Sequence, residues 1–220
     1  MKRTVLLCAA LLVSVAASAQ EVIKDWAKNY VFAEENAQVG VKPKAVFMGD
    51  SITQFWGDKD APFFSDNNFL ERGISGQTTC QMLVRFHQDV IDLHPKYVVI
   101  FAGTNDIAEN LGKTTLPNIL GNIKSMCELA KANRIRPVIC LLAPCDYYSW
   151  RKDLKPAPEI VRLNAMLSEY ARSARIPCAD FFSILTDGND ALRPECTTDR
   201  CHLSLEGYKL IEAEILKFLK

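Results

Sequence analysis

The chain has 220 residues, of which 49% are hydrophobic and 24% are charged, and 26 Lys and Arg balance 26 Asp and Glu. A chain of this length buries one sizeable core, and the composition is that of an ordinary globular domain. A net charge of zero excludes a generally basic protein that binds nucleic acid and a protein with an acidic tail. Only three histidines and as many as eight cysteines stand out.

The first residues have the pattern of an export signal. Lys2 and Arg3 precede an apolar run over residues 4–15, and a small-residue Ala-Ser-Ala pattern ends at Ala19. The run is too short to span a bilayer, and no second one follows. A membrane anchor or a buried N-terminal helix is the alternative. We expect residues 1–19 to be a signal peptide cleaved after Ala19, and the mature chain to be exported to the periplasm or outside the cell, with no membrane span.

Seven of the eight cysteines follow this segment. Export permits disulfides, but most of these cysteines lie in apolar stretches, where a free buried thiol is usual. Cys196 and Cys201 differ because they bracket a polar loop, and the sequence leaves open whether they form a bridge. No paired C-x-x-C spacing occurs, so we expect no metal site.

The rest of the chain is expected to fold in two parts: an N-terminal extension over residues 20–43 and one domain over residues 44–220. The extension is polar with scattered aromatics, and we expect it to be a helix over residues 21–38 that packs on the body. The expected strands of the domain are Ala45–Met48, Phe69–Arg72, Tyr97–Ala102, Pro137–Leu142 and Ile176–Ala179. The expected helices are Thr79–Leu93, Leu116–Asn133, Pro158–Ser173 and Ser204–Leu219. This alternation predicts an α/β three-layer sandwich with a central, mostly parallel five-stranded sheet.

Functional residues of such folds gather on the loops at the carboxyl ends of the strands. The first such loop, residues 49–53, reads Gly-Asp-Ser-Ile-Thr. A serine on a sharp strand-to-helix turn lies near the positive end of a helix, which favours developing negative charge. Ser51 is therefore a candidate nucleophile. A helix cap, for which Asp and Ser are favoured, is the alternative.

Two later loops carry candidate ligand contacts. Gly73 and Gly76 lie three residues apart and let the backbone approach a ligand with no Cβ in the way. Asn105, in the loop after the third strand, can aim its amide into the crevice. An ordinary glycine turn and a capping asparagine are the alternatives.

The C-terminal region supplies a candidate base. Asp199 precedes His202 by three residues, close enough to accept a hydrogen bond from Nδ1 and leave Nε2 as a base. His87 lies in an amphipathic segment and His94 precedes a proline, and neither has so well placed a carboxylate. By elimination, His202 is the candidate general base.

These four blocks, in this order, resemble the SGNH (GDSL-type) hydrolase superfamily over residues 44–220. The layout is similar to that of the bacterial relatives of platelet-activating-factor acetylhydrolase subunits. The resemblance implies a flavodoxin-like fold and a carboxylic ester hydrolase that needs no cofactor. Two departures are that Glu71 stands where an asparagine is common, and that Cys201 precedes the histidine.

The resemblance also implies residue roles. Ser51 would be the nucleophile, His202 the general base and then acid, and Asp199 its orienting partner. The oxyanion hole would consist of the Ser51 and Gly76 backbone N–H groups and the Asn105 amide. Each such donor is typically worth about 3 kcal/mol.

The substrate is less defined. A mature chain of this size has little left for a lid or a deep acyl tunnel, so we expect a short acyl group, acetyl above all. Tyr147, Tyr148 and Trp150 follow the fourth strand and would form a platform for a sugar ring, with ordinary aromatic packing as the alternative. We therefore expect a secreted serine esterase that acts on a small-molecule or glycan ester, with no metal or organic cofactor and no nucleic-acid partner. The alternatives are a lipase, lysophospholipase or thioesterase, and a non-catalytic glycan-binding module.

Overall fold

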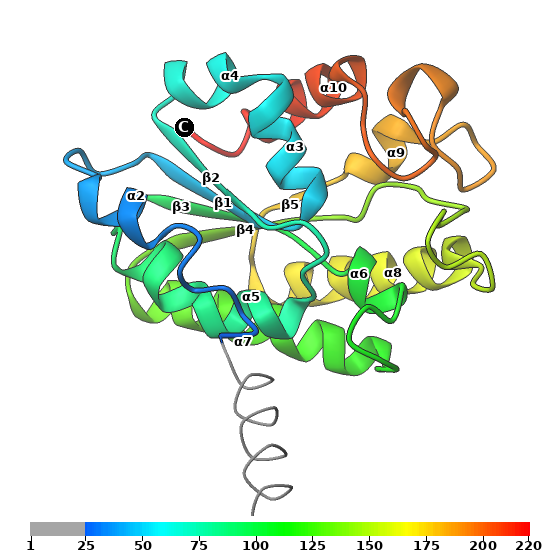
Figure 1. The fold of residues 1–220 in the computed structure, drawn as a ribbon, viewed down its shortest axis with the longest axis horizontal. Coiled ribbons are helices and arrows are strands. Elements are labelled where there is room, and N and C mark those ends of the chain that lie inside the picture. The colour runs from blue at the N-terminus through cyan, green and yellow to red at the C-terminus, as the bar shows by residue number, and fades with distance from the viewer. Residues whose placement is uncertain (1–24) are drawn as a thin grey trace, which may run out of the picture.

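The computed structural model describes residues 25–220, so the expected signal peptide lies outside the described residues. Its central layer is a five-stranded sheet with the strand order β2-β1-β3-β4-β5, in which all neighbouring strands are parallel (Figure 1). The strands are β1 (Ala45–Gly49), β2 (Phe69–Gly73), β3 (Tyr97–Phe101), β4 (Arg136–Cys140) and β5 (Cys178–Ala179). The predicted parallel α/β sheet is confirmed.

Helices cover both faces of the sheet, which makes the three layers (Figure 1). One layer contains α5 (Thr79–Phe86), the π-helical turn η1 (His87–Ile91), α6 (Thr104–Ile107), α7 (Leu116–Ala132) and α8 (Pro156–Ala174). The other contains α3 (Ser51–Lys59), α4 (Ala61–Asp66), α9 (Phe181–Leu185) and α10 (Leu205–Ile215), with the short 3-10 helix η2 (Pro194–Cys196) leading to α10.

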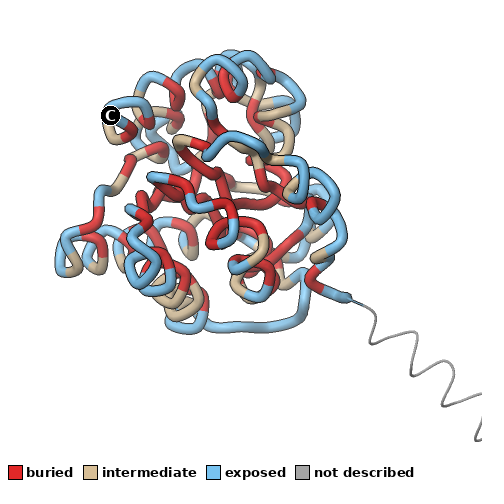
Figure 2. The backbone as a smooth tube through the Cα atoms, turned by 90° about the vertical axis from the view of Figure 1, so that its left-hand side faces the viewer, coloured by how far each residue is buried: buried red, intermediate tan, exposed pale blue. Residues whose placement is uncertain are grey.

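The central strands β1 and β3 are buried along their whole length because both helical layers cover them (Figure 2). Along β1, Val46 and Met48 join the core under α5, α7 and α8, whereas Ala45 and Phe47 join the core under α3, α4 and α10. Such strands read as continuous apolar runs rather than alternating ones. This is why the apolar runs of the sequence locate the strands to within about two residues.

The register of the sheet sets where the functional loops meet. Gly49 at the end of β1 pairs with Gly73 at the end of β2 and with Phe101 at the end of β3. The loops that follow these three strands therefore leave the sheet at one edge, next to one another. Sequence motifs separated by some 25 residues are brought side by side in this way.

The N-terminal extension differs from its prediction. Among its described residues, 25–43, only α2 (Ala33–Gln38) is helical, and residues 25–32 form successive turns. The Asp25 carboxylate accepts hydrogen bonds from the Asn29 amide (2.7 Å) and the Tyr30 N–H (3.2 Å), and Lys28 has a φ of 56°, which a continuous helix does not allow. Local side-chain bonds of this kind compete with helix formation.

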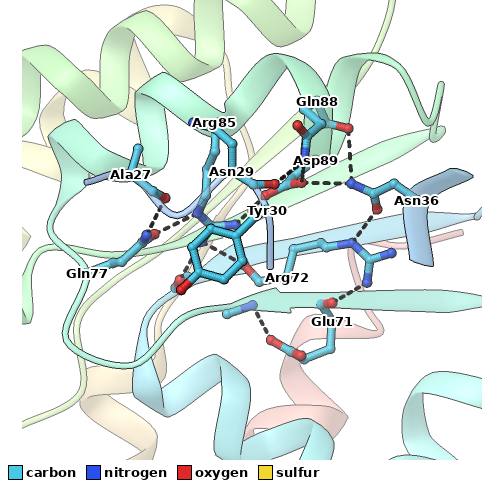
Figure 3. Close-up of polar contacts among 12 residues, drawn as sticks. Ala27, Asn29, Tyr30, Asn36, Glu71, Arg72, Gln77, Arg85, Gln88 and Asp89 are labelled. Carbon is cyan, nitrogen blue, oxygen red and sulfur yellow. Dashed lines mark hydrogen bonds and ion pairs between the residues drawn. The ribbon is translucent and has the colours of Figure 1, made fainter. Parts of the chain in front are cut away.

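The extension is held to the body by polar contacts, which Figure 3 shows. Gln77 donates from Nε2 to the Ala27 carbonyl (2.7 Å), and Gln88 donates likewise to the Asn29 carbonyl (2.6 Å). Asn36 on α2 accepts a hydrogen bond from Arg72 on β2 (2.9 Å). Residues 27–36 thus contact the body of the protein through these hydrogen bonds rather than as one continuous helix.

Candidate active site

Three side chains from distant parts of the chain form one hydrogen-bonded row. The Ser51 hydroxyl Oγ lies 2.9 Å from Nε2 of His202, and Nδ1 of His202 lies 2.7 Å from Oδ2 of Asp199. A carboxylate can only accept a hydrogen bond, so Nδ1 carries the proton and Nε2 is left as the acceptor facing the serine. The row has the connectivity of a serine hydrolase triad.

The short turn from Asp199 to His202 fixes the histidine ring. Oδ1 of Asp199 accepts hydrogen bonds from the backbone N–H of His202 (2.7 Å) and of Cys201 (3.0 Å), while Thr197 donates to the His202 carbonyl (2.8 Å). Partial burial alone would raise the pKa of Asp199, but the hydrogen bonds from His202 and Cys201 hold it below its usual value. The carboxylate is therefore ionised and aligned at neutral pH.

The turn after β1 exposes the serine hydroxyl to this histidine. Asp50 is the N-cap of α3, and its Oδ1 accepts a hydrogen bond from the Ile52 N–H (3.0 Å). A Cβ on Gly49 would lie 1.9 Å from the Thr53 hydroxyl, so this turn requires glycine. The capping role considered for this motif falls to Asp50, which leaves Ser51 to bond with the base. Burial raises the pKa of Asp50 to about 6.

The two expected oxyanion loops lie at the same edge. Gly76 has a φ of +80°, a conformation that favours glycine, and Asn105 on α6 is buried and donates from Nδ2 to the Gln77 carbonyl (3.0 Å). The structure thus brings Asn105 next to Gly76, its expected partner. Gly73 has a packing role instead, because a Cβ there would lie 2.3 Å from the backbone nitrogen of Gln54.

Asp106 ties these loops to α5. Its carboxylate accepts hydrogen bonds from the Thr79 N–H (2.9 Å) and the Thr79 hydroxyl (2.6 Å). Burial raises the pKa of Asp106 to about 6. The residue therefore holds the loop after β3 to the start of α5.

A buried arginine supports the site and was not expected from the sequence. Nη2 of Arg85 donates to the carbonyls of Gly49 (3.0 Å) and Arg72 (2.9 Å), and Nε donates to the Gln77 side chain (2.6 Å). Nη1 pairs with the buried Asp89 at 2.9 Å (Figure 3). Arg85 therefore joins the ends of β1 and β2 to the Gly76–Gln77 turn. One signal in the sequence could have indicated this role: Arg85 lies on the apolar face of an amphipathic helix, beside Met82 and Phe86.

The aromatic platform is only partly present. Tyr148 is fully buried, and its hydroxyl donates to the Thr104 carbonyl (3.0 Å), so its prediction as a substrate contact is corrected to a packing role. Tyr147 is half-buried and has the Arg200 guanidinium over its ring at 5.0 Å. Trp150 remains 41% exposed, with its ring 6.3 Å from that of His202. Of the three, Trp150 has the position that a substrate contact needs.

The cysteine bridge is not formed in the structure. Cys196 and Cys201 are both free thiols, as are the other cysteines within residues 25–220. Cys196 packs in the core beneath α9 and α10, whereas Cys201 packs in the core on the other side of the sheet. The loop between them passes from one helical layer to the other, which turns the two side chains away from each other. His87 and His94, set aside above as bases, are exposed.

A parallel flavodoxin-like sheet with a serine after its first strand and a histidine on its last loop defines the SGNH class of hydrolases. Comparison with known proteins agrees: the model of the GDSL-like Lipase/Acylhydrolase family matches residues 47–210, and the chain belongs to this family. It is a carboxylic ester hydrolase, as predicted.

Similar proteins include two solved structures from Bacteroides. One, from Bacteroides fragilis, is 44% identical, has a TM-score of 0.86, and the match covers 89% of this chain and 97% of that one. The other, a GDSL-like lipase from Bacteroides thetaiotaomicron, is 42% identical with a TM-score of 0.84. That match covers 88% of this chain and 97% of the lipase. The isoamyl acetate-hydrolyzing esterase of Saccharomyces cerevisiae is 25% identical over 206 residues, 80% of this chain and 86% of the yeast protein.

Proposed function

We propose that the chain hydrolyses short-chain carboxylic esters, acetyl esters above all, through an acyl-enzyme on Ser51. The observation that carries this is the row Ser51–His202–Asp199, with separations of 2.9 and 2.7 Å. A weakly nucleophilic hydroxyl needs a neighbouring base that is itself oriented by a third group, and this row supplies both.

The proposed reaction begins at Ser51. Oγ of Ser51 attacks the ester carbonyl carbon while Nε2 of His202 takes the hydroxyl proton. The negative charge on the tetrahedral oxygen is stabilised by the N–H groups of Ser51, Gly76 and Asn105. The carbon–oxygen bond to the alcohol then breaks, and His202 returns its proton to the departing alkoxide. Water, deprotonated by His202, attacks the acyl-enzyme and releases the acid and the free serine.

The preference for a small acyl group is inferred from the aromatic packing near Asn105. The buried Tyr148 ring fills the space beside Thr104, and the Trp150 ring packs on it at a centroid distance of 4.9 Å. Both rings are tied to the segment that carries Asn105, Tyr148 through Thr104 and Trp150 through Asn110. The yeast relative is named for hydrolysis of isoamyl acetate, which is also an acetyl ester.

The alcohol part of the ester is proposed to be a carbohydrate. Trp150 presents a partly exposed ring 6.3 Å from the ring of His202, the residue that protonates the leaving group in the proposed reaction. Aromatic faces of this kind pack against the apolar faces of sugar rings. The proposed activity is therefore carbohydrate O-deacetylation.

An acyl-length series tests the function. We expect the protein from residue 20 onward to hydrolyse p-nitrophenyl acetate faster than the butyrate and far faster than the octanoate, and Ser51→Ala to lose at least about 10³-fold in kcat. A preference for octanoate, lysophospholipid or acyl thioester would favour a lipase or thioesterase instead. Full activity in Ser51→Ala would overturn the nucleophile, and inactivity on every ester with retained glycan binding would favour a binding module.

The alcohol part is tested with acetylated xylose and glucosamine oligomers against alkyl acetates of equal size. We expect a higher kcat/KM for the sugars, and Trp150→Ala to lower it for the sugars more than for p-nitrophenyl acetate. Equal rates for sugar and alkyl acetates would contradict the carbohydrate assignment while leaving the esterase intact.

Export by a signal peptide is part of the proposal. The pattern Lys-Arg, apolar run and Ala-Ser-Ala supports it. Within residues 25–220, no helix is long and apolar enough to cross a membrane. N-terminal sequencing of the protein from a cell fraction outside the cytoplasm should begin at Gln20. An intact N-terminus in the cytoplasm would contradict it.

A further inference from the structure

Asn110 contacts both of the loops that are proposed to bind the oxyanion. Its Nδ2 donates to Oδ1 of Asn105 (2.8 Å) and to the carbonyl of Gly76 (3.2 Å). Its Oδ1 accepts a hydrogen bond from Nε1 of Trp150 (3.0 Å). One exposed side chain thus joins the loop after β2, the loop after β3 and the segment after β4.

The chemistry of these groups fixes which way each amide faces. An indole N–H can only donate, so the oxygen of Asn110 must face Trp150 and its NH2 group must face Asn105 and Gly76. The oxygen of Asn105 must then face Asn110. Each amide is oriented by the one before it, and the series begins at the donor-only tryptophan.

The same contacts fix the plane of the Asn105 amide. One of its N–H groups donates to the Gln77 carbonyl (3.0 Å), and its oxygen accepts from Asn110 (2.8 Å). With two of its hydrogen-bonding positions occupied, the amide cannot rotate, and the second N–H is the donor that the proposed oxyanion hole uses. Preorganised donors of this kind stabilise a transition state without reorganisation at the moment of reaction.

We propose that Asn110 is a positioning residue of the oxyanion hole, and that Trp150 sets its orientation. The inference rests on the proposed function, because it assumes that Gly76 and Asn105 are the oxyanion donors. Asn110 holds the residues of two of the three donors at once, so its loss affects the transition state more than the bound substrate. Trp150 accordingly has two faces: a ring toward the substrate and an N–H edge toward the oxyanion loops.

Asn110→Asp is the most direct variant. It is nearly isosteric and still accepts from Trp150, but it cannot donate to Asn105 or to Gly76. We expect kcat for p-nitrophenyl acetate to fall about 10–30-fold, as for the loss of two hydrogen bonds that support a catalytic donor, with KM changed less than about twofold. Trp150→Phe keeps a ring but removes the orienting N–H, and we expect a smaller fall in kcat of about 3–10-fold.

A transition-state analogue separates positioning from a structural role. A trifluoromethyl ketone that adds to Ser51 should bind to Asn110→Asp about 10–30-fold more weakly, in parallel with kcat. The matched control is Asn133→Asp at the end of α7, where the amide donates to the Leu129 carbonyl (2.9 Å) beside the amino ends of the strands. It should alter stability without altering kcat or inhibitor affinity.

The outcomes distinguish the two proposals. If Asn105→Ala loses activity while Asn110→Asp and Trp150→Phe stay within twofold of the parent in kcat and inhibitor affinity, the role of Asn110 is wrong and the oxyanion hole stands. If Asn105→Ala itself stays fully active, the proposed oxyanion hole is wrong and the role of Asn110 falls with it. A fall in inhibitor affinity in the order Asn105→Ala, Asn110→Asp, Trp150→Phe supports the inference.

Discussion

Oγ of Ser51 lies 2.9 Å from Nε2 of His202, although the two residues are 151 positions apart in the chain. Two further contacts between α3 and α10 explain how this separation is held. The Tyr208 hydroxyl donates to the Ile52 carbonyl (2.7 Å), and the Trp56 indole donates to Glu212 (3.1 Å). Both are buried bonds, so the helix that begins at the serine and the helix that follows the histidine behave as one unit.

Asn105→Ala tests the oxyanion hole directly. The substitution removes one donor without touching Ser51 or His202, so we expect kcat for an aryl acetate to fall about 10²–10³-fold with little change in KM. Steady-state kinetics measure this, and circular dichroism checks the fold. An unchanged kcat in a folded variant would exclude Asn105 as an oxyanion donor.

Asp199→Asn tests the orientation of the base. An amide at this position can present its NH2 group to Nδ1, which places the proton on Nε2, where it can no longer accept one from Ser51. We expect kcat to fall about 10²–10⁴-fold. The lower part of the range applies if water takes over the hydrogen bond from Nδ1, because the Asp199 side chain is 40% exposed. The control is Asp153→Asn, an exposed partner of Arg151, which should leave kcat within twofold. Comparable kinetics in the two variants would contradict the role of Asp199.

The residues that sequence predicted best are those whose chemistry depends on local pattern. Ser51 lies on a strand-to-helix turn, which makes it a candidate nucleophile. Asp199 and His202 lie three residues apart, which makes them a candidate carboxylate–base pair. The strands were found because burial on both faces leaves uninterrupted apolar runs. Amphipathic segments between these runs identified four of the helices to within a few residues, apart from the π-helical turn that follows α5.

Residues that act through distant contacts were not predictable. Asn110 meets Asn105 and Trp150 only because three loops end at one edge of the sheet. The sequence around Arg85 does not reveal that its guanidinium donates hydrogen bonds to the carbonyls at the ends of β1 and β2. For Tyr148 the sequence leaves a substrate contact and aromatic packing both open, because no local pattern reveals that the Thr104 carbonyl lies within reach of its hydroxyl.

Arg85→Met should destabilise the fold strongly. The substitution leaves Asp89 as a buried carboxylate without its cation and removes the donors to Gly49, Arg72 and Gln77. We expect the free energy of unfolding to fall by about 3–5 kcal/mol, measured by urea denaturation. Arg162→Met, which breaks an exposed pair with Glu159 on α8, should change it by less than about 0.5 kcal/mol. Equal effects of the two substitutions would show that the buried network does not stabilise the protein.

Glu71→Gln should change how stability depends on pH. Burial raises the pKa of Glu71 to about 8, against the opposing effects of the Gly73 N–H and of Arg72 and Arg85. A carboxyl whose pKa is higher in the folded state favours folding when protonated. Its contribution is therefore complete below its unfolded pKa, near 4.5, and is lost as the pH rises toward 8.

The glutamine keeps an oxygen for the Gly73 N–H but never ionises, so it does not lose this contribution. We expect the free energy of unfolding of Glu71→Gln, relative to the parent, to rise between pH 5 and pH 8 by about 3–4 kcal/mol, and then to level off. Urea denaturation at pH 5, 7 and 9 measures it. The control is Glu169→Gln, an exposed partner of Arg172 on α8, whose difference from the parent should stay flat over the same range. A flat difference for Glu71→Gln as well would mean that this carboxyl is ionised in the folded protein at neutral pH.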